Sequence, residues 1–380
     1  MITLRKFQQE AYEAWLTNGC VGILKAVTGS GKSYVALRAV EVSPSGVLIV
    51  VPTVALQDQW KAHLGKLGLC CGLVGNGCKE FKNITIAVIN SLRGEDISQF
   101  RLIIADELHR YFSNENYKVI KFIANDSANN KYMGSFLGLS ATPERADLVN
   151  FEQFIQKVPI IYEHDLEDAV LYGSICKFEV KREWCCLSDV EQTIYDRASE
   201  IIKQQLDFYG GFHLAMAVMQ RGRARRLSEA INERKQVLAN STAKIQKAAE
   251  LINLLGKKVI VFSEFIDSLE LLKKYIKQTI PVCEYHSKMK KKERATQIET
   301  FKTTPGAVLL SARALDEGLD IPECDTAIVM SGSSKNRQFV QRLGRILRPG
   351  KDKIATSIEI VIKGTIDERW SRTRRIKHEI

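Results

Sequence analysis

The fold of this chain is decided by the stretch AVTGSGKS at residues 26–33. The apolar run that precedes it, including Ile23 and Leu24, is typical of a short buried strand, and residues 34–40 are typical of a helix. A strand, a loop of small residues ending in Gly-Lys-Ser and then a helix form the context in which such a loop binds phosphate. The backbone N–H groups of the loop and the positive end of the helix would surround the phosphates. Ala26 stands at the first position, where the strictest pattern has glycine.

We therefore expect a nucleotide site at this loop. Lys32 is expected to reach the β- and γ-phosphates of ATP, and the Ser33 hydroxyl is expected to hold Mg²⁺. The predicted nucleotide-binding residues of the loop are Thr28, Gly29, Ser30, Gly31, Lys32 and Ser33.

A second chemical feature is the acidic pair Asp106-Glu107, which directly follows the apolar strand predicted at residues 100–105. A pair in this position has the placement of a Walker B motif. Asp106 is expected to hold Mg²⁺, and Glu107 to orient and deprotonate the attacking water. Because solvated loop carboxylates rarely follow a fully apolar strand, we prefer the catalytic interpretation.

The totals for the chain limit its class. A length of 380 residues predicts two or three domains, and 45% hydrophobic with 26% charged residues is typical of a globular protein. The longest apolar runs fall short of the ~20 residues of a membrane span, and the first residues lack the apolar segment of a signal peptide. We expect a cytoplasmic, intracellular protein with no membrane partner. The nine cysteines include no CxxC pair, which favours reduced thiols over a metal cluster.

The positive charge of the chain is concentrated in its second part. Residues 1–200 contain 21 Lys and Arg against 24 Asp and Glu, whereas residues 201–380 contain 34 against 20. The net charge is therefore −3 in the first part and +14 in the second. Such a basic region indicates a polyanionic partner, most simply nucleic acid, although a solvated lysine-rich surface would carry the same charge.

Strands and helices alternate in two separate parts of the chain. In both parts polar residues follow the apolar strands, which predicts parallel sheets with ligands at the carboxyl ends of the strands. We expect a first α/β domain over residues 1–158, a connector with a helical thumb-like segment over 159–241, and a second α/β domain over 242–380.

The middle segment is predicted to form two long helices around a hinge at Gly210-Gly211. Four arginines would lie on or near the second arm, namely Arg221, Arg223, Arg225 and Arg226. We interpret this segment as a nucleic-acid grip. The alternative is a solvated connector between two domains.

The motifs of the first part resemble those of superfamily 2 DEAD/DEAH-type helicases. Residues 26–33, 51–53, 106–109 and 140–143 look like motifs I, Ia, II and III of that superfamily. The resemblance implies that Arg5 and Gln8 form an adenine-reading element and that Thr53 contacts the nucleic-acid backbone. It also implies that Ser140 and Thr142 couple the ATP site to the nucleic-acid site.

The second part resembles the second RecA-like domain of the same superfamily, with motifs IV, V and VI at residues 262–263, 311–322 and 341–348. The resemblance implies nucleotide contacts from Gly318 and Asp320 and a contact from Gln341 to the γ-phosphate or the attacking water. Arg345 and Arg348 would be arginine fingers. Because they are three residues apart, they share one face of the predicted helix. The implied fold is two RecA-like parallel-sheet domains with a thumb-like helical insert between them.

Within the superfamily the chain most resembles the XPB-like DNA-repair helicases and their phage and archaeal relatives. It reads QRLGRILR at 341–348, unlike the His-Arg-x-Gly-Arg of DEAD-box RNA helicases, and its helical insert stands where that group has its thumb. The resemblance implies an ATP- and Mg²⁺-dependent DNA helicase or double-stranded DNA translocase that hydrolyses ATP between two lobes. DNA is expected in preference to RNA, with protein partners that supply targeting or nuclease activity. The alternatives are an RNA helicase and an ATPase subunit that remodels or loads a complex without separating strands.

Overall fold

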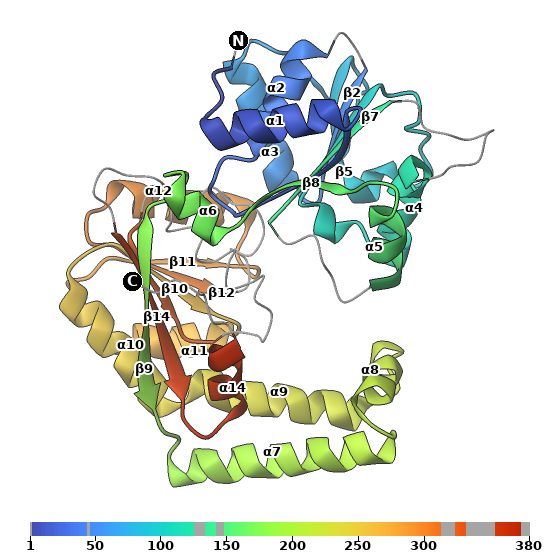
Figure 1. Cartoon of the computed structure of the whole chain (residues 1–380). Coiled ribbons are helices and arrows are strands. Elements are labelled where there is room, and N and C mark those ends of the chain that lie inside the picture. The colour runs from blue at the N-terminus through green and yellow to red at the C-terminus, as the bar shows by residue number, and fades with distance from the viewer. Residues whose placement is uncertain are drawn as a thin grey trace. The chain divides into compact units, whose positions relative to one another are not determined.

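The computed structural model describes residues 2–43, 46–124, 134–141, 148–312, 324–331 and 354–373. The chain divides into two compact units, one comprising Met1–Lys177 and the other beginning at Phe178. Each unit is built on a single large sheet with helices against it (Figure 1). The described strand pairs are parallel in both sheets, apart from one short antiparallel pair in the first, which confirms the predicted α/β class.

The sheet of the first unit has the strand order β4-β3-β5-β2-β6-β7-β1-β8. Only β4, at one edge, runs antiparallel to its neighbour among the described strands. The strands are β1 (Val21–Ala26), β2 (Val47–Val51), β3 (Gly72–Gly75), β4 (Cys78–Lys79), β5 (Ile84–Val88), β6 (Leu102–Asp106), β7 (Ser135–Ser140) and β8 (Ile160–His164).

The central strands of this sheet are buried on both faces because helices cover each side. Along β2, Ile49 packs in one apolar core and its neighbour Val50 packs in the other. This alternation explains why the strand is continuously apolar instead of alternating with polar residues. One face is covered by α1 (Lys6–Thr17), α2 (Ser33–Val42) and α3 (Val54–Lys66), and the other by α4 (Asn114–Ile120) and α5 (Leu148–Ile155). The short elements are η1 (Ile89–Leu92), η2 (Leu108–Arg110), η3 (Lys121–Ala124) and α6 (Leu166–Leu171).

The sheet of the second unit has the strand order β11-β12-β10-β13-β14-β9. Its strands are β9 (Lys177–Cys185), β10 (Val259–Ser263), β11 (Val282–His286), β12 (Val308–Ala312), β13 (Thr326–Val329) and β14 (Ile354–Ile362). The accompanying helices are α10 (Thr242–Leu255), α11 (Ile266–Lys273), α12 (Lys291–Thr303) and α14 (Ile366–Thr373). A buried ion pair between Lys244 and Asp367, with 2.7 Å between Nζ and Oδ2, joins α10 to α14.

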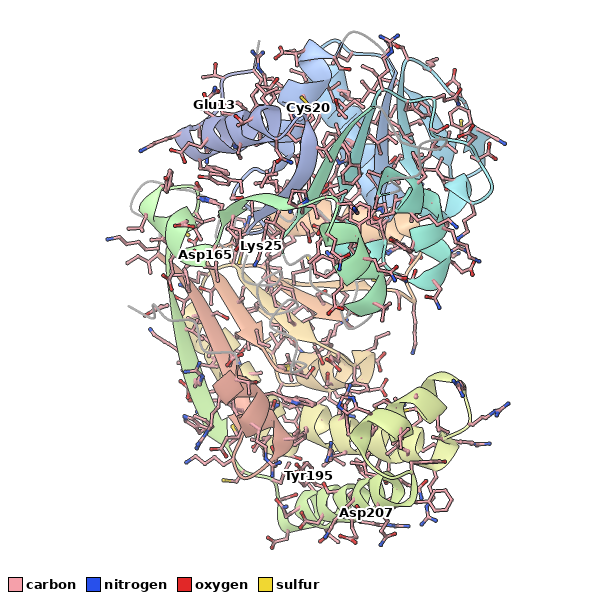
Figure 2. The ribbon with its side chains drawn as sticks, turned by 45° about the vertical axis from the view of Figure 1, so that its right-hand side comes forward. Glu13, Cys20, Lys25, Asp165, Tyr195 and Asp207 are labelled. Atoms are coloured by element: carbon pink, nitrogen blue, oxygen red, sulfur yellow. The ribbon has the colours of Figure 1, made fainter. Side chains whose placement is uncertain are left out.

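The predicted helical hairpin is present in the second unit, but it has three helices where two were expected. These are α7 (Asp189–Phe208), α8 (Phe212–Gln220) and α9 (Arg225–Asn240). In the view of Figure 1, α7 and α9 run alongside each other and α8 lies at their far end. Tyr195 lies in the first half of α7 and Asp207 is its next-to-last residue; both are labelled in Figure 2. The Tyr195 hydroxyl accepts a hydrogen bond from the Ile366 N–H at 2.8 Å, so the base of the hairpin is attached to the second unit.

The extra helix has a local cause. Gly210 and Gly211 both adopt positive φ, so α7 ends there and the chain changes direction. The next residues, FHLAMAVMQ at 212–220, are largely apolar, and Ala215 is fully buried in a small core with Ile202 and Leu227. Without α8 over the hairpin end, this small core would be open to water.

The segment predicted as a connector contributes a strand to each sheet. The predicted boundary at residue 158 leaves out β8, which pairs with β1 in the first sheet, and β9 joins the edge of the second. The boundary between the two compact units lies instead after Lys177. Strand β9 has the sequence KFEVKREWC, and over its first five residues polar and apolar side chains alternate as in a strand with one exposed face.

Among the residues that the structure describes, no helix is both long and apolar enough to cross a membrane. The nine cysteines, all within the described ranges, form no disulfide, and four of them are buried. In the same described ranges no three His, Cys, Asp or Glu side chains cluster as a set of metal ligands.

Candidate nucleotide site

The loop between β1 and α2 has the wound conformation that phosphate binding needs. Gly29 and Gly31 adopt φ of 91° and 94°, a region that glycine enters without steric cost. Ser30 is buried, and its hydroxyl donates to the Val27 carbonyl at 2.8 Å, which closes the loop internally. Helix α2 begins at Ser33, directly after the loop, so the partial positive charge of its amino end lies beside the loop.

A buried hydroxyl in this loop indicates that a ligand atom belongs there. The Thr28 Oγ1 atom is buried and has no hydrogen-bond partner among the described residues. A buried polar atom without a partner is unfavourable unless a bound group satisfies it. The loop N–H groups and Lys32 suit a polyphosphate, and the Ser33 hydroxyl with the Asp106 carboxylate supplies the oxygen ligands that Mg²⁺ prefers. The residues present thus fit ATP and Mg²⁺.

The Arg5–Gln8 element lies directly against the phosphate loop. The Arg5 N–H donates to Gln8 Oε1 at 2.9 Å, and Gln8 Nε2 donates to the Gly31 carbonyl at 3.0 Å. The φ of 94° favours glycine at position 31, and a Cβ atom there would stand 2.8 Å from Gln8 Nε2 and displace the end of that side chain. The contact fixes the start of α1 to the loop, and the adenine-reading role of Arg5 and Gln8 stays a prediction.

The acidic pair meets the phosphate loop through its second member. Asp106 is the last residue of β6, and Glu107 adopts the left-handed φ of 51°, uncommon for a residue that is not glycine. This conformation turns the chain so that Glu107 Oε1 lies 3.6 Å from Lys32 Nζ. Lys32 and Glu107, which have 74 residues between them in the sequence, are therefore close in space. Strained backbone of this kind persists where the surrounding structure holds it, often at functional sites.

The Asp106 carboxylate is held by two donors in a buried environment. It is only 4% exposed, its Oδ1 accepts from the Glu107 N–H at 2.9 Å, and its Oδ2 accepts from Trp60 Nε1 at 2.9 Å. Burial raises the pKa of this carboxyl, and the adjacent Glu107 charge raises it further. The Lys32 ammonium and the Trp60 hydrogen bond oppose that rise.

Trp60 is a site residue that the sequence did not reveal. It lies on α3, buried, and reaches Asp106 because α3 packs on the face of the sheet that contains β2 and β6. A tryptophan on an amphipathic helix carries no motif signal. Only the parallel pairing of β2 with β6 brings the two residues together. We interpret Trp60 as a residue that positions the Asp106 carboxylate.

Replacing Trp60 by phenylalanine is expected to raise the Mg²⁺ concentration required for half-maximal ATP turnover about tenfold. Phenylalanine keeps an aromatic ring at this position but has no N–H to donate to Asp106. Loss of a hydrogen-bond partner of a metal ligand typically weakens metal binding or activity 10- to 100-fold. The measurement is ATP turnover against Mg²⁺ concentration.

The matched control is Trp15→Phe. Trp15 is also buried in the first unit and donates its indole N–H at 2.9 Å, but to the Phe136 carbonyl at the start of β7. Each variant should lose about 1 kcal/mol of stability. A Mg²⁺ shift of equal size in both variants would show that the Trp60 effect is general destabilisation.

Ser140 and His109 connect the end of β7 to the acidic pair. The Ser140 hydroxyl lies 3.2 Å from His109 Nδ1, and the same nitrogen lies 3.4 Å from Glu107 Oε2. The register of the sheet places Lys25 of β1 beside Ser140 and Leu139 beside Asp106. The phosphate loop, Ser140 and the acidic pair thus follow three neighbouring parallel strands at their carboxyl ends, where ligands bind in sheets of this type. The coupling role of Ser140 stays a prediction.

The predicted nucleic-acid residues lie at exposed or half-exposed positions. Thr53 is the N-cap of α3, and its hydroxyl accepts from the Leu56 N–H at 3.3 Å. The four arginines lie at the turn between α8 and α9 and in the first turn of α9, all exposed. They are therefore at the tip of the hairpin, where the second arm, α9, begins, which agrees with the predicted position on or near that arm.

Six predicted residues fall outside the described ranges, so their roles stay sequence-based predictions. They are Thr142, Gly318, Asp320, Gln341, Arg345 and Arg348.

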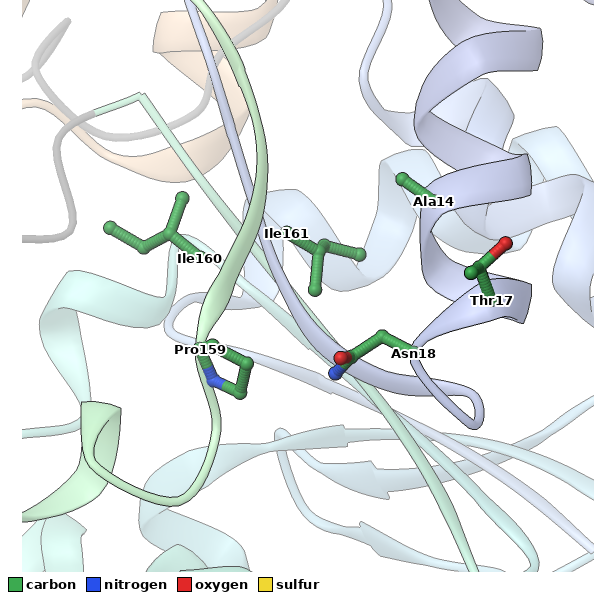
Figure 3. A pocket seen from close by; sticks show the side chains of 6 residues that line it. All are labelled: Ala14, Thr17, Asn18, Pro159, Ile160 and Ile161. Carbon is green, nitrogen blue, oxygen red and sulfur yellow. The ribbon is translucent and has the colours of Figure 1, made fainter.

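A hollow elsewhere on the first unit is distinct from the nucleotide site (Figure 3). Its lining residues are Ala14, Thr17, Asn18, Pro159, Ile160 and Ile161. They lie at the end of α1 and just before or at the start of β1 and β8. The hollow is thus at the amino ends of the strands, opposite the phosphate loop.

Comparison with known proteins places the chain in a family. Residues 1–145 match the model described as type III restriction enzyme, res subunit, and residues 243–350 match the helicase conserved C-terminal domain. The chain is 36% identical over 388 residues to the DNA 3'-5' translocase XPB2 of Sulfurisphaera tokodaii, covering 98% of this chain and 85% of that protein. This chain belongs to the XPB family. The resemblance drawn from its motifs is therefore confirmed.

Members of the XPB family differ in length. A Haloarcula marismortui relative, named a putative DNA 3'-5' helicase Rad25, is 26% identical over 99% of this chain, which spans only 55% of that relative. Among solved structures, the helicase domain of Hef from Pyrococcus furiosus matches with a TM-score of 0.61 and 17% identity, covering 98% of each chain. This structural similarity supports the fold of two RecA-like domains expected of the XPB family.

Proposed function

We propose that this chain is an ATP-dependent DNA helicase or double-stranded DNA translocase. The observation that carries the proposal is the contact between Lys32 and Glu107, which joins the phosphate loop to the acidic pair. A relative with 36% identity is named a DNA 3'-5' translocase, which supports DNA as the substrate. The exposed arginines of the hairpin tip supply positive charge for phosphate contacts.

The residues of the first unit divide the chemistry among them. Lys32 would pair with the β- and γ-phosphates and so exchange its contact with Glu107 for one with the nucleotide. Glu107, released from that ion pair, would orient the attacking water and accept its proton. Ser33 and Asp106 would hold Mg²⁺, which supplies neutralisation of phosphate charge when bound.

The second unit is proposed to complete hydrolysis through the residues that the family motif implies. Arg345 and Arg348 would neutralise charge on the γ-phosphoryl group, with Gln341 at the attacking water. Closure around ATP and opening after hydrolysis would then move the chain along DNA. Ser140, which contacts His109 beside Glu107, is suited to transmit the state of the acidic pair.

The test is ATP turnover by the purified chain without nucleic acid and with duplex DNA, single-stranded DNA or RNA. We expect DNA to stimulate turnover and RNA to stimulate it less. Strand-displacement and triplex-displacement assays then separate unwinding from translocation on duplex DNA. Stimulation by RNA alone would favour an RNA helicase. DNA-stimulated turnover with neither kind of displacement would favour a loading or remodelling subunit that needs protein partners.

A further inference from the structure

The tip of the helical hairpin exposes aromatic side chains that its own core does not use. Phe208, at the end of α7, is 78% exposed, and Phe212, at the start of α8, is 61% exposed. They flank Gly210 and Gly211, and Leu214 beside them is 60% exposed. Large apolar side chains grouped in this way on a surface indicate a binding site.

The turn that carries these rings is well defined. Gly210 and Gly211 hold positive φ, and the Gly211 N–H donates to the Leu206 carbonyl at 2.8 Å. The Phe208 ring lies edge-on to Tyr209, with ring centroids 5.0 Å apart. Both phenylalanines are thus presented outward by a short hydrogen-bonded turn with a packed core beneath it.

The exposed arginines lie at the same end of the hairpin. The Tyr209 hydroxyl donates to the Arg223 carbonyl at 3.5 Å, which links the aromatic turn to the arginine turn. Arg225 pairs with Glu229 at 2.7 Å, and within the described part of the chain no ion pair is found for Arg221, Arg223 or Arg226. The tip therefore combines exposed aromatic faces with uncompensated positive charge.

We propose that this tip, comprising Phe208, Phe212, Arg221, Arg223 and Arg226, binds unpaired nucleotides, with bases stacked on the phenylalanine rings and phosphates held by the arginines. Aromatic side chains beside a positive groove are how proteins bind single strands without reading sequence. Bases inside a duplex have no free face for stacking, so a grip on duplex phosphates alone would not need the rings. The surrounding arginines favour a polyanion over an apolar protein surface. The inference rests on the proposed function only for its biological use, because binding is testable without ATP.

The experiment compares Phe208→Leu/Phe212→Leu with the unchanged chain, using no nucleotide. The probes are an oligodeoxythymidylate with a single 2-aminopurine and a blunt duplex of equal length. Leucine keeps apolar surface but has no aromatic face. We expect the double variant to bind the single strand about tenfold more weakly and to lose quenching of 2-aminopurine, while duplex affinity changes less than twofold. Phe208→Tyr/Phe212→Tyr should restore both signals.

Two further variants make the result specific. Replacing Arg221, Arg223 and Arg226 by alanine should weaken binding of both probes and reduce its salt dependence. Leu254→Ala, at an apolar residue of α10 that is 75% exposed, should change neither. Because all substituted side chains are exposed, melting temperatures should stay within 2 °C of the unchanged chain, by the usual size of surface effects.

Unchanged single-strand binding and quenching in the leucine variant would overturn the inference, as would an equal loss on the duplex. If the leucine variant and the unchanged chain bind the single strand equally well, the exposed tip would instead fit an apolar protein partner. If DNA fails to stimulate ATP turnover, the proposed function fails while this binding test still decides the inference. If turnover is stimulated and the leucine variant binds normally, only the inference fails.

Discussion

Replacing Lys32 by alanine is expected to reduce ATP turnover by at least about a hundredfold, with or without DNA. Lys32 is only 8% exposed and faces both the phosphate loop and the acidic pair, so no solvent cation can take its place in the same geometry. Its loss also leaves Glu107 and Asp106 adjacent without the ammonium that lowers the Asp106 pKa. That pKa should therefore rise further, and Mg²⁺ binding should weaken together with phosphate binding. Steady-state phosphate release measures the effect.

The matched control for this substitution is Lys25→Ala on the adjoining strand. Lys25, labelled in Figure 2, lies on β1 just before the phosphate loop and pairs with Glu163 at 3.2 Å. Removing Lys25 deletes a lysine and an ion pair from the strand that leads into the phosphate loop but leaves the site intact. ATP turnover should therefore stay within about twofold of that of the unchanged chain, as expected for a partly exposed ion pair. Near-normal turnover in Lys32→Ala would refute the assignment of this loop as the catalytic phosphate site.

The sequence predicts the nucleotide site well because its parts are contiguous. Residues 26–33 contain the end of a strand, a loop and the start of a helix in one continuous stretch. The conformation of this stretch depends mainly on its own residues, such as the glycines of the loop. The acidic pair is equally local, since it directly ends an apolar strand. Both follow strands predicted to be parallel, and sheets of this type bind ligands at the carboxyl ends of their strands. In the structure Lys32 Nζ and Glu107 Oε1 lie 3.6 Å apart, which brings the loop and the acidic pair together.

What the sequence does not reveal depends on packing between distant elements. Trp60 joins the site only because α3 packs beside the end of β6, and His109 has two partners that the motif alone does not specify. Strand β14 was not predicted, although its residues 354–362 are nearly all buried between β13 and β9. The hairpin illustrates a different limit. Its helical periodicity was evident, but the third helix follows from two positive-φ glycines and an apolar segment that needs burial.

Arg345→Ala is expected to leave ATP affinity within a fewfold of the unchanged chain and to reduce turnover by about 10³- to 10⁵-fold, the usual effect of an arginine finger. The residue lies outside the described ranges, so the prediction rests on the motif at residues 341–348. Affinity and turnover should respond differently because an arginine supplied by the second unit would stabilise charge that develops only during transfer, whereas Lys32 would also contact the bound nucleotide. Equilibrium binding of a fluorescent ATP analogue and single-turnover hydrolysis measure the two quantities separately.

Comparing Lys32→Ala with Arg345→Ala tests whether the first unit hydrolyses ATP alone or needs a residue from the second unit. Lys32→Ala should weaken both binding and turnover, while Arg345→Ala should affect turnover alone, which is the signature of an interaction made only in the transition state. Arg345→Lys keeps the charge but loses the planar fork, so it should recover only part of the rate. If Arg345→Ala instead loses ATP affinity with an unchanged turnover number, Arg345 contributes uniform binding. Hydrolysis would then be completed by the first unit, and coupling to motion on DNA would have to arise elsewhere.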